Sequence, residues 1–122
     1  MKIEALRTIL FKVWSLESSS KWTPDNPAKG QCGVTALVVH DLLLGEIFKT
    51  ETEGSWHFYN VINGTIFDFT ASQFTSPITY LNIPSNREEA FQDTNCAQYT
   101  YLKEHVLTLL NEEESPFEEN CY

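Results

Sequence analysis

Residues 55–69 read SWHFYNVINGTIFDF, and this stretch decides which kind of fold the chain can form. Two runs rich in aromatic and β-branched residues, 55–62 and 65–69, flank the pair Asn63-Gly64. Such runs are typical of strands, and Asn-Gly is the preferred pair for a two-residue type I′ turn. The stretch therefore predicts an antiparallel hairpin.

The two-residue turn also fixes the register of the hairpin. Counting outward from the turn, Tyr59 faces Asp68 and His57 faces Thr70. These four side chains share one face because side chains alternate along a strand. Asp68 is then diagonal to His57, at a separation that two side chains can bridge. A register shift of one residue would turn Asp68 to the opposite face.

A loop and an apolar segment precede the hairpin. Residues 21–30, KWTPDNPAKG, are rich in turn formers and predict a loop. Residues 31–44, QCGVTALVVHDLLL, are apolar on several faces, which is typical of a buried helix. Gly45 is a typical helix stop, and residues 46–50 then predict a short strand.

Further helical patterns lie on both sides of this centre. Residues 3–14 place apolar side chains at helical spacing and predict an amphipathic helix. Residues 71–85 contain two prolines and predict an extended loop. At its end, Ser85 and Glu88 form the pattern of a capping box, which predicts a short helix through Phe91.

The C-terminal part of the chain predicts one more helix and a tail. Thr94 or Asn95 is expected to cap a helix that runs to about residue 110. Residues 111–122 contain five glutamates and predict an acidic C-terminal tail. A chain of 122 residues with 42% apolar content suits one domain with one core, which we place at residues 1–110.

Charge and hydropathy exclude several classes of function. The chain has 8 Lys and Arg against 17 Asp and Glu, a net charge of −9, which argues against binding nucleic acid. No run is long and apolar enough to cross a membrane, and the first residues do not resemble a signal peptide. We expect a cytoplasmic protein without membrane contact. Its acidic surface is compatible with binding a protein partner.

The cysteines are the next clue to chemistry. Cys32, Cys96 and Cys121 form an odd set without paired Cys or His spacing. This pattern indicates neither a disulfide framework nor a structural zinc site. We therefore expect reduced thiols, no metal and no cofactor.

Cys32 stands where a loop delivers it to the first turn of the predicted buried helix. Free backbone N–H groups and the helix dipole favour thiolate there, so the sequence predicts a lowered thiol pKa. The same N–H groups can stabilise an oxyanion, with Gln31 as a second donor. If Asp68 holds one ring nitrogen of His57, the other is free to deprotonate the thiol.

Four further residues are candidates for substrate binding. Trp22 and Trp56 are expected to line a cleft beside the cysteine, although buried aromatic residues more often belong to a core. Asn26 and Thr70 are weaker candidates for the same role.

Three segments resemble the YunG-like family of small bacterial proteins. They are KWTPDNPAKGQCGVTALVV at residues 21–39, GSWHFYNVINGTIFDFTASQF at 54–74 and NREEAF at 86–91. More distantly, the chain order Cys, His, Asp resembles the papain-like core of transglutaminases and arylamine acetyltransferases.

The distant resemblance implies an α+β fold of papain or transglutaminase type. A buried helix carrying the cysteine would pack on a small antiparallel sheet, with flanking N- and C-terminal helices. It also implies that Cys32, His57 and Asp68 take the three catalytic positions.

Two functions from different classes follow. The first is a cysteine-dependent hydrolase or acyltransferase, which forms a covalent acyl-enzyme from an amide, ester or thioester in a small-molecule, peptide or protein substrate. The alternative is a non-catalytic binding or regulatory module on the same fold, in which Cys32 is an ordinary buried thiol. A metal site at Cys32 and His57 lacks enough ligands at a recognisable spacing.

Overall fold

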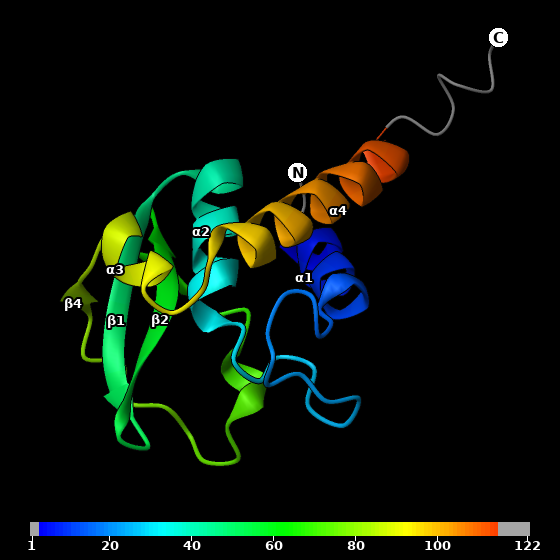
Figure 1. The fold of residues 1–122 in the computed structure, drawn as a ribbon. Helices are drawn as coiled ribbons and strands as arrows, with labels where there is room; N and C mark the ends of the chain where they lie inside the picture. The colour runs from blue at the N-terminus through cyan, green and yellow to red at the C-terminus, as the bar shows by residue number, and fades with distance from the viewer. Residues whose placement is uncertain (1–2, 115–122) are drawn as a thin grey trace, which may run out of the picture.

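The computed structural model of the chain describes residues 3–114 and shows four α-helices and one small antiparallel sheet (Figure 1). The predicted α+β class is therefore confirmed. Across the sheet the strands run in the order β3-β2-β1-β4. Their bounds are Glu46–Thr52 for β1, Ser55–Ile62 for β2, Thr65–Phe67 for β3 and Ile83–Pro84 for β4.

The predicted hairpin and its register are confirmed. Ile62 pairs with Thr65 across the turn, and Asn60 pairs with Phe67. Asn63 and Gly64 have φ values of 51° and 79°, the left-handed conformations that a type I′ turn requires. Strand β3 ends at Phe67, two residues earlier than expected, so the pairs predicted beyond it are not part of the ladder.

Helix α2 lies between the sheet on one side and helices α1 and α4 on the other (Figure 1). The helices span Ile3–Val13 for α1, Cys32–Leu43 for α2, Arg87–Phe91 for α3 and Cys96–Glu114 for α4. One side of α2 packs on α1 and α4 through Val34 and Val38, and the other packs on the sheet through Ala36 and Leu37. Packing on both sides explains why this helix is apolar all round. Within residues 3–114, no helix is long and apolar enough to cross a membrane.

Short helix α3 begins one residue later than expected. Its cap is Asn86, whose side chain accepts the Glu89 N–H at 2.9 Å, and Ser85 instead donates its hydroxyl to Glu89 Oε1 at 2.7 Å. The Ser85 N–H is bound to the Ile47 carbonyl at 2.9 Å, which continues the pairing of β4 with β1. Ser85 is thus held beside the sheet, and the predicted capping box is wrong by one position.

Helix α4 has one of the two expected caps. The Asn95 side chain accepts the Gln98 N–H at 2.9 Å. The helix continues to Glu114, so residues 111–114 of the predicted tail are helical, and residues 115–122 lie outside the described residues.

Helix α3 lies along α2 and contacts it near both ends. At one end Arg87 forms an ion pair with Asp41 at 2.9 Å and donates to the Leu37 carbonyl at 3.3 Å. At the other end the Ala90 carbonyl approaches Gly33 so closely that a Cβ there would lie 2.8 Å from it. Helix α3 therefore holds the turn that follows it against the start of α2.

The loop predicted at residues 71–85 covers the sheet face opposite α2. It contains a short 3-10 helix, Ala71–Gln73, and strand β4. The Thr50 hydroxyl donates to the Thr79 carbonyl at 2.7 Å, and the Tyr59 hydroxyl donates to Asn82 at 2.7 Å. Both faces of the sheet are thereby covered near its centre.

Candidate active site

His57 and Asp68 form a buried pair, as the hairpin register predicts. The distance from His57 Nε2 to Asp68 Oδ2 is 2.6 Å. The same Asp68 oxygen accepts the Tyr80 hydroxyl at 2.9 Å, and Oδ1 accepts the Thr70 N–H at 3.2 Å and its hydroxyl at 3.4 Å. Thr70 thus positions the carboxyl group that holds the histidine.

The remaining ring nitrogen of His57 is buried and has no hydrogen-bond partner within residues 3–114. Because the Asp68 oxygens act as acceptors, we assign the proton to Nε2, which leaves a lone pair on Nδ1. The ring is fixed by Phe74, edge-on at 4.9 Å, and by Tyr59, stacked at 6.2 Å. An unpaired buried nitrogen of this kind is rare unless it serves a function.

Cys32 is the first residue of α2, and its side chain reaches the edge of β2. The thiol accepts a hydrogen bond from the backbone N–H of Phe58, the residue after His57. Two pairs beyond the end of the observed ladder, Phe58 would face Phe69. Because β3 ends at Phe67, the Phe58 N–H is not paired with that strand and is available to the sulfur.

The histidine and the cysteine approach β2 from different directions. Asn60 faces α2 and donates to the Ala36 carbonyl at 3.1 Å, whereas His57 lies on the other face with Tyr59. Among the described residues, the thiol's side-chain partner is Asp93 Oδ2 at 3.4 Å, and no hydrogen bond joins Cys32 to His57. The structure brings the sulfur to the peptide group beside the histidine rather than to its ring.

The predicted lowering of the Cys32 pKa is wrong for this arrangement. Burial raises the pKa of the thiol, and the negative charge of Asp93 raises it further. The hydrogen bond from Phe58 opposes both effects but is smaller. Burial also raises the pKa of the Asp93 carboxyl itself. The backbone N–H groups at the start of α2, which would favour a thiolate, also bind the Asp93 carboxylate.

Asp93 also occupies a backbone N–H group in the first turn of α2. Its Oδ2 accepts the Gly33 N–H at 3.1 Å. A Cβ on Gly33 would lie 2.7 Å from both Cβ and Oδ2 of Asp93. Glycine at this position is therefore what allows the carboxylate to approach the helix.

A pocket of about 220 Å³ opens beside Cys32. Trp56, which is 48% exposed, lines it as predicted, and Lys49 lies 4.4 Å above the Trp56 ring. The other lining side chains include two lysines and an aromatic ring, namely Lys21, Lys29 and Phe74. The pocket is small, and its lining carries both signs of charge, because Glu53 and Asp93 stand with the two lysines.

Other predicted binding residues lie elsewhere. Gln31 is fully buried and its amide donates to the Ser15 carbonyl at 3.5 Å, so it is not directed at the thiol. Trp22 packs against the core formed by α1, α2 and α4. Asn26 donates to the Gln73 carbonyl at 3.1 Å. Among the described residues, the pocket beside Cys32 is lined by none of these three.

Sequence reasoning missed Asp93 and Tyr80. Asp93 lies 61 residues after Cys32, in the turn between α3 and α4, and Tyr80 lies in the loop that covers the sheet. No local pattern marks either residue, because their roles arise from the way distant segments pack.

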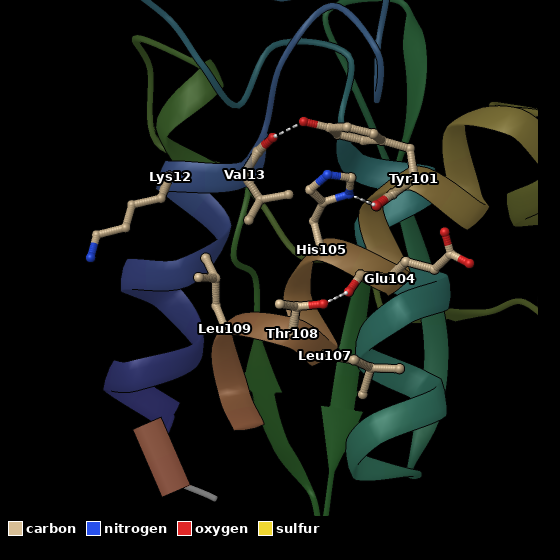
Figure 2. Close-up of a pocket in the computed structure, with 8 residues that line it drawn as sticks. All are labelled: Lys12, Val13, Tyr101, Glu104, His105, Leu107, Thr108 and Leu109. Atoms are coloured by element: carbon tan, nitrogen blue, oxygen red, sulfur yellow. Dashed lines mark hydrogen bonds between the residues drawn. The ribbon is translucent and has the colours of Figure 1, made fainter. Parts of the chain in front are cut away.

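A larger pocket, of about 700 Å³, lies between α1 and α4 (Figure 2). His105 lies in it and donates from Nδ1 to the Tyr101 carbonyl at 2.8 Å, while the Tyr101 hydroxyl donates to the Val13 carbonyl at 3.3 Å. Among the described residues that line this pocket there is no cysteine, so none of them is the nucleophile of the expected chemistry.

These features define a small α+β protein with a buried thiol beside a histidine–aspartate pair. The chain belongs to the YunG family, because the family model described as YunG protein matches residues 2–111. It is 58% identical over 102 residues to the uncharacterized protein YunG of Bacillus subtilis (strain 168), which covers 84% of this chain and 89% of that protein. The YunG resemblance is confirmed. No solved structure matches the chain.

Proposed function

We propose that this protein is a cysteine-dependent hydrolase or acyltransferase with Cys32 as nucleophile, His57 as base and Asp68 as the residue that orients the base. The observation that carries the proposal is the state of His57: Nε2 is bound to Asp68 at 2.6 Å, and Nδ1 is buried with no partner in the part of the chain that the structure describes. A carboxylate that fixes one imidazole nitrogen leaves the other available as a base.

The proposed reaction begins when the Cys32 side chain leaves Asp93, approaches the His57 ring and transfers its proton to Nδ1. The sulfur then forms a bond to the carbonyl carbon of an amide, ester or thioester, and the carbonyl electron pair moves to oxygen. As the tetrahedral intermediate collapses, the bond to the leaving group breaks and His57 returns the proton to that group. Water or an amine then attacks the acyl carbon and gives a proton to His57. The bond from that carbon to sulfur breaks, and His57 returns the proton to the Cys32 thiol.

We propose in addition a distant relation to the papain-like core. A cysteine opens a buried helix that packs on an antiparallel sheet, and the histidine and aspartate come from neighbouring segments of a hairpin. This likeness rests on the order and placement of three residues, and fold likeness alone does not assign an activity. We also propose a cytoplasmic location, consistent with the free thiols of Cys32 and Cys96.

The test is acylation by an activated ester, p-nitrophenyl acetate, followed by peptide mass spectrometry and nitrophenol release. We expect an acetyl group on Cys32 in the wild type and none at that position in Cys32→Ala. Loss of a general base typically costs about 100-fold or more, so His57→Gln should slow acetylation of Cys32 to that extent. His105→Gln is the matched control, since His105 is exposed in the other pocket.

The result that would overturn the proposal is acetylation confined to the exposed Cys96, or a Cys32 rate that does not depend on His57. Either result favours the second candidate, a non-catalytic binding or regulatory module. The raised pKa of the Cys32 thiol, caused first by burial and then by Asp93, is the observation in favour of that alternative.

A further inference from the structure

Asp93 lies between two pockets on the same side of the molecule. The pocket of about 220 Å³ beside Cys32 and a second of about 330 Å³ are both lined by Ser55, Trp56 and Asp93. The second pocket continues along Phe58, Glu89 and Gln92. The Asp93 side chain therefore stands at the boundary between the two spaces.

At that boundary the carboxylate binds both groups that catalysis would need. Asp93 Oδ2 accepts the thiol hydrogen of Cys32 at 3.4 Å and the Gly33 N–H at 3.1 Å. A backbone N–H at the start of the cysteine helix is the donor that would stabilise a carbonyl oxygen during attack. A single oxygen of Asp93 thus engages the nucleophile and fills the position of an oxyanion.

We propose that Asp93 is an internal inhibitor of the site, which a substrate carbonyl has to displace before Cys32 can react. The inference rests on the proposed function. Once the Asp93 side chain is displaced, the Gly33 N–H could bind the substrate oxygen. The two pockets on either side of the thiol would then form one continuous site. The substrate class that fits is an acyl compound with groups on both sides of its carbonyl, such as an internal amide or ester.

The charges around Asp93 agree with this role. Cys32 on α2 faces it, and a thiolate there would be repelled by the carboxylate. Lys21 attracts the carboxylate from the loop before α2. Removing the Asp93 charge therefore removes a cost of thiolate formation and leaves the positive charge of Lys21 in place.

The test is the rate of iodoacetamide alkylation at Cys32, read by peptide mass spectrometry at pH 7, in wild type and Asp93→Asn. Each unit by which the thiol pKa falls raises the thiolate fraction about tenfold, and we expect at least that gain in Asp93→Asn. Asp93→Glu keeps the charge and should remain within about threefold of the wild type. Asp25→Asn removes an exposed carboxylate from the preceding loop and should change nothing.

A rate for Asp93→Asn no higher than that of the wild type would overturn the inference. Asp93→Ser, which also lacks the charge, provides the same comparison if the asparagine variant does not fold by circular dichroism. The outcome separates the two proposals. Faster alkylation in Asp93→Asn, together with acetylation of Cys32 that does not depend on His57, supports the inhibitor and counts against His57 as base. If acetylation of Cys32 depends on His57 but alkylation is no faster in Asp93→Asn, the proposed enzyme is supported and the proposed inhibitory role of Asp93 is rejected.

Discussion

Replacing Gly33 with alanine tests whether the start of α2 is shaped around Asp93. The new Cβ would lie 2.7 Å from Cβ and Oδ2 of Asp93 and 2.8 Å from the Ala90 carbonyl. Overpacking of this kind costs about 1–3 kcal/mol, while the better helix propensity of alanine returns at most about 1 kcal/mol. We expect a net loss of about 1–2 kcal/mol in the free energy of unfolding.

Urea unfolding, with a thermal scan beside it, measures this loss. For a chain of this size, 1 kcal/mol corresponds to a drop of about 4 °C in the melting temperature. Because part of the crowding comes from Asp93, the cost of Gly33→Ala should fall by about 0.5 kcal/mol or more in an Asp93→Gly background. A Gly33→Ala protein as stable as the wild type would show that α3 and its turn move away without cost, and the reasoning would be refuted.

Three further changes test the packing and the charge of the same region. Asn86→Ala removes the cap of α3 and should cost about 1 kcal/mol in urea unfolding. Leu102→Ala empties a fully buried position between α1 and α4 and should cost about 2–5 kcal/mol in the same assay. Because the pKa of the Asp93 carboxyl is raised in the folded state, the folded protein binds this proton more tightly than the unfolded chain does. The protonated carboxyl therefore stabilises the fold at low pH, and this stabilisation is lost as the pH rises through the folded-state pKa. Asp93→Asn should therefore melt higher than the wild type at pH 7, with a gain that shrinks toward pH 4, close to the ordinary aspartate pKa of about 3.9.

The hairpin shows how far the sequence alone predicts this structure. Asn63-Gly64 specifies the turn, the turn specifies the register, and the register places Asp68 beside His57. Each step depends on neighbours in the chain, for which the physical rules are local. The buried helix beginning at Cys32 follows in the same way from its apolar pattern.

The environment of the thiol could not be predicted in this way. The expected pKa of the thiol depended on the helix start and on a neighbouring imidazole, whereas in the structure burial and a carboxylate from a turn far along the chain raise it. The role expected of Gln31 failed for a related reason, since its amide is directed toward the Ser15 carbonyl by the path of the preceding loop. Such effects depend on which segments meet in space, and a single sequence holds no local signal for them.

The contacts of α3 along α2 have a consequence for experimental conditions. The Arg87–Asp41 ion pair holds the far end of α3, and its side chains are 34% and 18% exposed, so dissolved ions reach it. High ionic strength weakens such pairs, and a loosened α3 holds the turn that carries Asp93 less firmly. Added salt should then act on the chemistry of Cys32 from the opposite end of the helix, and buffer composition becomes a variable to be fixed when the reactivity of this protein is compared between laboratories.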